Sequence, residues 1–206
     1  MAQLRLGVAL VIACFFTGTA SLAQDIEFTT FNAALSNVSF VSIVPNVRER
    51  TNALLATLSK ELDHRELLVK LDPSLSYEVV KGFQEVFNPR ARIELLQLFE
   101  SKGLWTANAF KQGSDLLIAS SLPIISSQFH RFEDNQIRRN FGVLEAIIER
   151  PNGQRFRAFT THTAFSDQKG LNPLHKNQLL KIAQLVRFNP DRLPTVLLCD
   201  INMGAT

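Results

Sequence analysis

Apolar and polar positions alternate with a period of two in parts of the chain, and this alternation predicts β-strands. Residues 25–31 alternate in this way, and residues 77–87 contain the β-forming residues of a short buried strand. Uninterrupted apolar runs predict two more buried strands, at residues 116–119 and 195–199. The chain therefore carries strand signals from near its start to near its end.

Helical periodicity occupies the intervals between these strands. Residues 45–62 carry a leucine stripe suited to packing on a sheet, with charged residues facing water. Residues 89–102 also have helical spacing of apolar positions, which predicts a second helix. Gly103 follows it and is well placed to end a helix. A third helix is expected to open at Asn172-Pro173, an N-cap followed by a first-turn proline. The order of strands and helices predicts an α/β fold.

A β-hairpin interrupts this alternation. Residues 142–149 and 155–161 are rich in β-formers and flank Asn152-Gly153, a strong hairpin signal. Residues 128–141, which precede the hairpin, read as a polar loop. A hairpin within an α/β chain predicts a mixed sheet rather than a purely parallel one.

Composition sets few limits on function. The chain has 206 residues, 46% of them hydrophobic and 20% charged, which is ordinary for a globular domain with one sizeable core. The formal net charge of +3 is too small to argue for nucleic acid, although it suits a partner that carries phosphates.

The first 23 residues have the organisation of a secretory signal. Arg5 provides a positive start, residues 6–16 are apolar, and small residues at Ser21 and Ala23 fit the positions that a signal peptidase reads. We expect cleavage after Ala23, a mature domain at residues 24–206, and a secreted or periplasmic location.

Cys14 leaves a second reading open, because small and aliphatic residues before a cysteine also occur in lipoprotein signals. The apolar run continues past Cys14, which favours the ordinary signal peptide. Its removal leaves Cys199 alone, so no internal disulfide is expected.

Polar side chains follow four of the predicted strands, and Glu85 is the first candidate among them. Ligands of α/β sheets bind outside the carboxyl ends of strands, and a carboxylate between apolar neighbours is rarely buried unless it is paired or holds a cation. Glu85 is therefore a candidate metal ligand, although a solvated loop glutamate is the simpler reading. Asn32 follows the first strand, where its alternative role is to form a turn.

The later strands end in further candidates. His162 follows the second arm of the hairpin and could bind phosphate, ligate a metal or transfer a proton. Its alternative is a half-buried histidine with a hydrogen-bonded partner. Asp200 and Asn202 follow the last apolar strand two residues apart, a spacing that places both on one face of extended backbone. Together they could orient a water molecule or bind a hard cation.

In this order, the four strand-end sites resemble those of the endonuclease/exonuclease/phosphatase superfamily, the DNase I-like metal-dependent phosphoesterases. The resemblance runs from about Ile26 to Asn202. Residues 83–87 and the secretory signal look most like the bacterial neutral sphingomyelinases. Three other pieces agree with the superfamily pattern, namely the segment 113–124, the start of the hairpin at 141–146, and Gln178.

This resemblance implies a four-layer DNase I-like sandwich of two mixed β-sheets flanked by helices. It also implies that Glu85 holds Mg²⁺ with Asn32 close by in the metal site, and that His162 donates a hydrogen bond to the substrate phosphate. Asp200 and Asn202 would orient the attacking water and its surroundings, with Asn202 also near the substrate.

The sequence departs from the superfamily pattern at several positions. Cys199 stands where glycine is usual, Ile201 replaces an aromatic residue, and Phe141 stands where sphingomyelinases often have lysine. The pattern closes with a strand that carries an Asp-His pair, and this pair has no match before Thr206. We therefore expect a domain lacking its last strands, very poor phosphodiester hydrolysis because the histidine of that pair is taken to be the general base, and an open sheet edge at residues 195–199.

Three functions remain open. The first is a secreted Mg²⁺-dependent, sphingomyelinase-like phosphodiesterase, which would work at a membrane surface. The second is a secreted nuclease, whose phosphate contacts would come from arginines. The third is a non-catalytic binding module on the same scaffold. The arginines available to a nuclease are Arg131, Arg138, Arg139, Arg150, Arg155 and Arg157.

Overall fold

The computed structural model describes residues 12–13, 26–35, 46–72, 75, 77–133, 140–164 and 173–202. Cys14, Asn172, Arg138 and Arg139, for which the sequence made predictions, lie outside these ranges, as does nearly all of the predicted signal peptide. In the first half of the chain the elements are β1 (Ile12–Ala13), β2 (Ile26–Asn32), α1 (Val47–Leu71), β3 (Glu78–Gln84), α2 (Pro89–Ser101), β4 (Trp105–Asn108) and the 3₁₀ turn η1 (Phe110–Gln112). In the second half they are β5 (Leu117–Ser120), β6 (Ile124–Arg131), β7 (Gly142–Glu149), β8 (Arg155–His162), α3 (Pro173–Arg187) and β9 (Thr195–Asp200).

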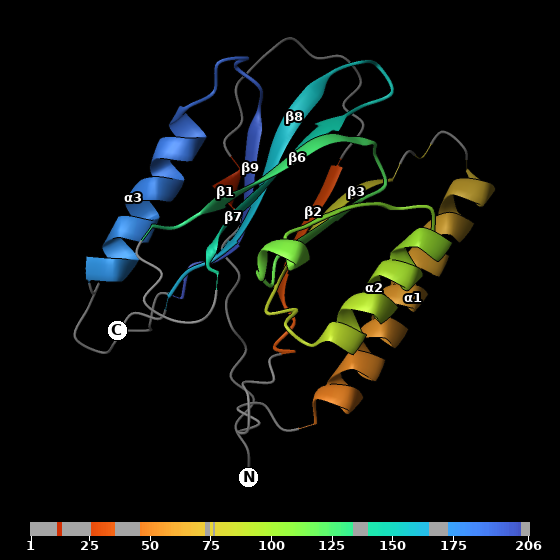
Figure 1. Cartoon of the computed structure of the whole chain (residues 1–206). Helices are drawn as coiled ribbons and strands as arrows, with labels where there is room; N and C mark the ends of the chain where they lie inside the picture. Colours follow the sequence, from red (N-terminus) through yellow and green to blue (C-terminus); the bar gives the residue numbers. More distant parts are fainter. Residues whose placement is uncertain are drawn as a thin grey trace.

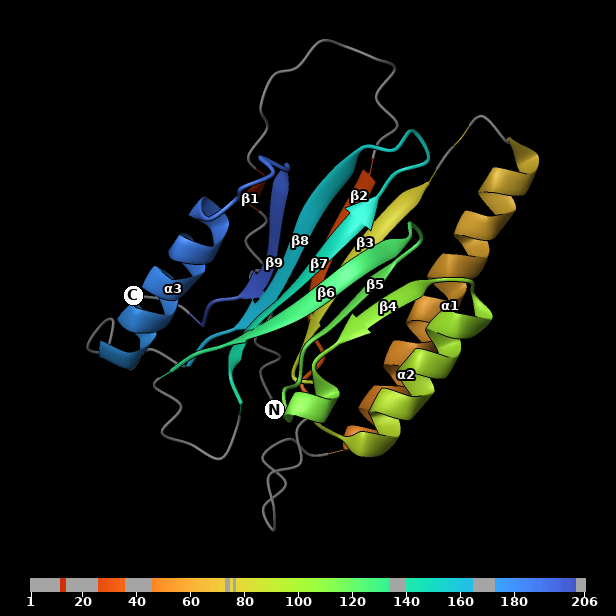
Figure 2. The same cartoon turned by 45° about the horizontal axis from the view of Figure 1, so that its top comes forward.

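The described elements form four layers (Figures 1 and 2). Helices α1 and α2 cover the outer face of a sheet with the strand order β2-β3-β5-β4. The inner face of that sheet packs on a second sheet, of order β1-β9-β8-β7-β6, and α3 covers the far face of the second sheet. Both sheets mix parallel and antiparallel pairs. The predicted DNase I-like sandwich is therefore confirmed.

The core between the sheets is apolar and closely packed. Val80, Ile118, Leu144 and Leu198 are fully or almost fully buried there. A Cβ atom on Gly82 would lie 2.7 Å from the Cβ of Leu198, so glycine permits the two sheets to approach at this point. This contact fixes β3 against β9 just before both strands reach their carboxyl ends.

The helices agree with their predicted stripes, with two differences. Leu54, Leu58 and Leu62 of α1 are buried as expected, but α1 continues to Leu71. The extra turns contain good helix formers and the i,i+4 ion pair Glu66–Lys70. In α3 the apolar residue Ala183 is exposed, whereas two polar side chains of the same helix, His175 and Gln178, are buried.

The predicted polar loop at residues 128–141 is wrong in its first part. Gln128–Arg131 belongs to β6, which pairs with β7 through a β-bulge near Ser126. Most side chains of β6 are exposed or half-buried because β6 is the last strand of its sheet in the described residues. An edge strand of this kind needs no apolar alternation, and so its sequence resembled a loop.

The edge of β9 also differs from the expectation. Ile12 and Ala13 pair with Leu197 and Val196, so this edge is partly covered rather than open. Both residues lie within the predicted signal peptide, whose removal after Ala23 stays a prediction. None of the described helices combines the length and the apolar character needed to cross a membrane.

Candidate active site

Two parallel strand pairs bring distant residues to one end of the sandwich. In the register of β2 and β3, Asn32 lies opposite Gln84, so Glu85 comes just beyond the pair. In the register of β8 and β9, His162 lies opposite Asp200. The carboxyl ends of all four strands meet, as the sequence predicted.

Asn32 connects the two carboxylates of this end. Its Nδ2 donates to Oε1 of Glu85 at 2.9 Å and to Oδ2 of Asp200 at 2.7 Å. Its Oδ1 accepts from the backbone N–H of Ala34 at 2.9 Å, which fixes the amide orientation. Because one nitrogen donates to both acids, the carboxylates of Glu85 and Asp200 both lie against the Asn32 amide, which separates two like charges.

His162 contacts the same group of side chains through Glu85. Its ring is buried, with Nδ1 2.9 Å from Oδ2 of Asp115 and Nε2 3.6 Å from Oε1 of Glu85. Burial lowers the pKa of His162, but the hydrogen bond and charge of Asp115, with the charges of Glu85 and Asp200, outweigh it. The net pKa is raised above its ordinary value, which favours the protonated, hydrogen-bond-donating ring.

Asp115 is the site residue that sequence reasoning missed. Its buried Oδ2 accepts from His162 and also from the backbone N–H of Glu85 at 2.7 Å. Asp115 precedes β5, and β5 runs antiparallel to β3, so the amino end of β5 meets the carboxyl end of β3. A search restricted to the carboxyl ends of strands passes over such a residue. The available signal was an acid directly before an apolar run.

The backbone of Glu85 is held in an unusual conformation. Its φ of 59° lies in the left-handed region, which costs a non-glycine residue about 1–2 kcal/mol. Hydrogen bonds overcome this cost, because the Glu85 N–H donates to Asp115 and its carbonyl accepts from Leu35 at 3.0 Å. The left-handed conformation turns the chain at the residue whose carboxylate contacts Asn32.

Asn202 differs from the extended geometry that its spacing suggested. The strand ends at Asp200, and Asn202 has a φ of 46°. Its backbone N–H donates to Oδ1 of Asp200 at 2.9 Å, and its Nδ2 donates to the carbonyl of Thr163 at 2.7 Å. The predicted pair is thus brought together by a turn and not by an extended strand.

Two further side chains hold the site in place. Gln84 is buried beneath Glu85, and its Nε2 donates to Oγ1 of Thr160 in the opposite sheet at 2.8 Å. Arg92 of α2 donates to the carbonyls of Val86 at 2.7 Å and of Ser114 at 2.9 Å. Those carbonyls flank Glu85 and Asp115, so Arg92 fixes the two loops that carry these acids.

Two of the three substituted positions that depart from the superfamily pattern, Phe141 and Cys199, also lie here. The ring edge of Phe141 meets His162, with the ring centroids 5.6 Å apart. Burial, and then the charge of Asp200, raise the pKa of the Cys199 thiol to about 11. The thiol is therefore protonated at neutral pH and is a poor ligand or nucleophile.

The donors present suit a hard cation held by few protein ligands. No group of three or more histidine, cysteine and acidic side chains in the described ranges has the arrangement of an all-protein metal cage. Mg²⁺ does not require one, because it keeps several waters and is commonly held by one or two carboxylates plus substrate phosphates. Glu85 and Asp200, converging on one amide, meet that requirement.

Comparisons with known proteins identify the fold. No protein-family model and no curated protein matches the sequence. Among solved structures, humanized D. rerio TDP2 superimposes with a TM-score of 0.62 at 15% identity, over 87% of this chain and 66% of that one. An endonuclease/exonuclease/phosphatase family protein from Leptotrichia buccalis gives 0.53 at 15% identity, over 88% and 67%. The chain has the fold of the endonuclease/exonuclease/phosphatase superfamily.

Sphingomyelinase C from Streptomyces griseocarneus shares this endonuclease/exonuclease/phosphatase fold less completely. Its TM-score is 0.50 at 16% identity, over 69% of this chain and 57% of that one. The chain thus spans about two thirds or less of the length of these superfamily structures. The likeness establishes the fold, and the chemistry has to be argued from the site.

Proposed function

We propose that the protein is a secreted, Mg²⁺-dependent phosphodiester hydrolase with a phospholipid substrate of the sphingomyelin type. One observation carries the proposal: Asn32, Glu85, Asp200 and the His162–Asp115 pair come from the ends of five strands and contact one another. Two acids, an amide and a histidine with a raised pKa are the groups that phosphoryl transfer uses. The predicted secretory signal supports the location, and the residue pattern at 83–87 supports the lipid substrate.

Each of these residues would have its own role in the reaction. Glu85 and the adjacent Asp200 would hold Mg²⁺, with Asn32 keeping the two carboxylates in register. When bound, the ion would polarise a phosphoryl oxygen and offset its developing charge. His162 has its Nδ1 engaged by Asp115, so Nε2 is the atom that faces Glu85 and would donate to a phosphate oxygen.

Asp200 is the residue best placed to orient an attacking water. One of its oxygens accepts from Asn32 and the other from the backbone of Asn202, so the carboxylate is fixed at both ends. The Asn202 amide nitrogen is committed to the Thr163 carbonyl. Its proposed contribution is therefore to hold Asp200 and to present its side-chain oxygen.

A nuclease is the second candidate, because a specific comparison favours it. D. rerio TDP2 solved with a single strand DNA product superimposes with a TM-score of 0.55 at 16% identity, over 87% of this chain and 61% of that one. Of the arginines considered for a nuclease, Arg150, Arg155 and Arg157 are already paired with glutamates, which weakens their availability to phosphates.

A substrate panel tests the proposal. The 206-residue chain would be incubated with labelled sphingomyelin in vesicles, single-stranded DNA and plasmid DNA, each with Mg²⁺ or with a chelator. We expect slow phosphocholine release that requires Mg²⁺ and vanishes in Glu85→Ala. Cleavage of DNA alone, weakening steeply as salt rises, would replace the lipid substrate with nucleic acid. Equal turnover with chelator, or by Glu85→Ala, would contradict the metal-dependent site.

A further inference from the structure

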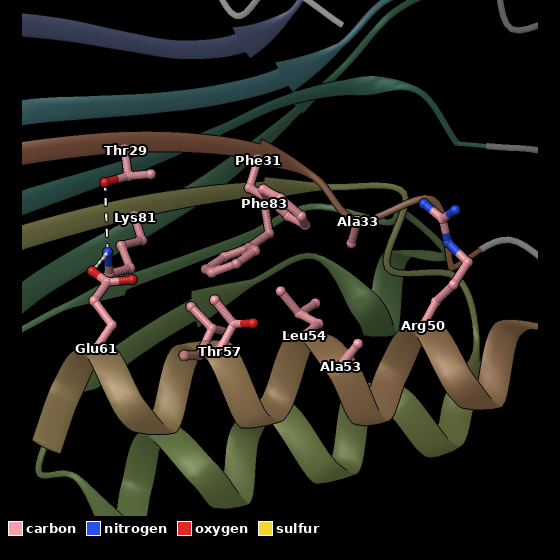
Figure 3. A pocket seen from close by; sticks show the side chains of 11 residues that line it. Thr29, Phe31, Ala33, Arg50, Ala53, Leu54, Thr57, Glu61, Lys81 and Phe83 are labelled. Carbon is pink, nitrogen blue, oxygen red and sulfur yellow. Dashed lines mark hydrogen bonds and ion pairs between the residues drawn. The ribbon is translucent and has the colours of Figure 1, made fainter. Parts of the chain in front are cut away.

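A cavity with a volume of about 360 Å³ lies outside the active site, between α1 and the outer face of β2 and β3 (Figure 3). We call it the outer pocket. Its sheet wall is built from two neighbouring pairs of the parallel register, Thr29 beside Lys81 and Phe31 beside Phe83. Alternation along β2 puts Asn32 on the opposite side, in the active site. The same strands thus present different chemistry on their two faces.

The middle of the outer pocket is apolar. Leu54 projects from α1 toward the sheet and Leu58 also lines the cavity, while Phe31 lies beside Phe83 with ring centroids 6.4 Å apart. Phe31 remains 44% exposed although it belongs to a strand covered by a helix. An aromatic ring left open inside a cavity is a surface that an apolar ligand would cover.

One end of the outer pocket is closed by an ion-paired group of one ammonium and two carboxylates. The ammonium group of Lys81 is 2% exposed and pairs with Glu61 of α1. It also lies 3.5 Å from Oγ1 of Thr29 and 3.8 Å from a carboxylate oxygen of Glu27. With two carboxylates around one ammonium group, this end does not attract an anionic head, and it sets a limit to the length of an apolar chain.

The other end carries a cation, Arg50, that pairs with no group in the described part of the chain. Arg50, in the second turn of α1, lies at the end of the pocket near Ala33 (Figure 3). Its guanidinium makes no ion pair or hydrogen bond with any residue in the described part of the chain. From Arg50 to Glu61 the helix rises about 16 Å, so the pocket is elongated. A guanidinium at the mouth of an apolar slot suits a carboxylate or phosphate.

We propose that the outer pocket binds a single-chain amphiphile with an anionic head, as a long-chain fatty acid has. The alkyl chain would lie along Phe31, Phe83, Leu54 and Leu58, and the head would pair with Arg50. The size of the pocket, its apolar lining and an arginine at one end that pairs with no described residue are the features of a small-molecule site. Binding here needs no catalysis, so this proposal stands or falls independently of the hydrolase activity.

Calorimetry with dodecanoate, kept below its micellar concentration, tests the pocket. We expect saturable binding to the 206-residue chain with one ligand per chain. Decanoate should bind about fifteenfold more weakly, because each buried methylene contributes about fourfold in affinity. Dodecyl phosphate distinguishes the source of the anion: binding as tight as that of dodecanoate leaves either head possible, and weaker binding selects the carboxylate.

Three variants locate the binding. Thr57→Trp fills the slot from an exposed position on the pocket rim and should abolish binding of every probe. Arg50→Gln should weaken dodecanoate about tenfold or more while leaving uncharged dodecanol unchanged. Lys60→Gln removes one positive charge from an exposed site on the same helix, outside the pocket, and should change nothing. Thermal unfolding of each variant checks that the fold is kept.

Four results would overturn the proposal. They are the absence of saturable dodecanoate binding, equal weakening by Arg50→Gln and Lys60→Gln, binding that survives Thr57→Trp, and affinity for vesicles alone. If Thr57→Trp does not fold, the comparison of Arg50→Gln with Lys60→Gln still decides whether the head pairs at the pocket mouth.

Discussion

The centre of the sandwich and its active-site end are made from the same strands, yet they follow opposite rules. At the centre, Gly82 lets Leu198 approach closely, and no charged group is present among the buried residues of that cluster. Three residues after Gly82, just past the end of β3, Glu85 has a left-handed backbone, and its carboxylate shares the Asn32 amide with the carboxylate of Asp200. Apolar packing between the sheets stabilises the centre, whereas the active-site end depends on hydrogen bonds that hold a strained backbone and like charges in place.

The largest expected effect is at Asp115, the one buried acid of the active-site end. Asp115→Ala would leave the ring of His162 and the N–H of Glu85 without their acceptor. We expect a loss of about 3–5 kcal/mol in the free energy of unfolding, measured by urea denaturation. Asp115→Asn is the matched control, since its amide oxygen can still accept, and should recover part of the loss. A loss below about 1 kcal/mol in Asp115→Ala would show that the end does not depend on this pair.

The next effect is at the centre. Gly82→Ala would place a methyl group 2.7 Å from the Cβ of Leu198, and we expect a loss of about 1–3 kcal/mol in stability with no change in Mg²⁺ binding. Gly153→Ala is the control. Gly153 has open space around it but a φ of 80°, so any loss of stability in that variant comes from backbone strain and not from packing. If Gly82→Ala proved neutral in denaturant unfolding, the close contact between the sheets would be discounted.

At Glu85, in contrast to Gly82, a substitution by glycine is expected to be the more stable one. In chelator, Glu85→Gly should be more stable than Glu85→Ala by about 1 kcal/mol, because only glycine adopts the left-handed conformation without strain. Both variants also remove one of two neighbouring carboxylates. Thermal unfolding of the pair measures the difference. Equal stability, or greater stability of the alanine variant, would mean that Glu85 is not strained.

The smallest expected effect is the pH dependence contributed by His162. Its pKa in the folded protein is raised above the ordinary 6.5, so protonation stabilises the fold. That contribution is complete below the unfolded pKa and is lost as pH rises through the higher folded value. In chelator, the stability difference between wild type and His162→Gln should therefore shrink as pH rises above about 6.5. A difference that grows over this range would reverse the assignment.

The sequence was informative wherever one face of an element is buried. Strands β2, β3 and β9 and helices α1 and α2 all lie where periodicity predicted them, because their apolar residues pack on a layer. Strands β4 and β6 were missed. Each is the last strand of its sheet in the described residues and has several exposed side chains, so neither shows a clear period.

The site could be predicted in part for a similar reason. Asn32, Glu85, His162 and Asp200 follow strands whose carboxyl ends meet, and local sequence is enough to mark such ends. Asp115 depends on β5 running antiparallel to β3, which no local pattern reveals. Arg92 and Gln84 act through contacts between layers, and a single sequence does not encode those contacts locally.

The central claim is that Glu85 and Asp200 form a Mg²⁺ site, and titration of the 206-residue chain with Mg²⁺ by calorimetry tests it most directly. We expect one saturable site, accompanied by a rise in the midpoint of thermal unfolding, that is lost in Glu85→Gln and in Asp200→Asn. Glu61→Gln is the control, since that carboxylate lies in the outer pocket, and it should bind Mg²⁺ as wild type does. Mg²⁺ binding that is absent from the wild type, or that persists unchanged in Glu85→Gln, would contradict the account.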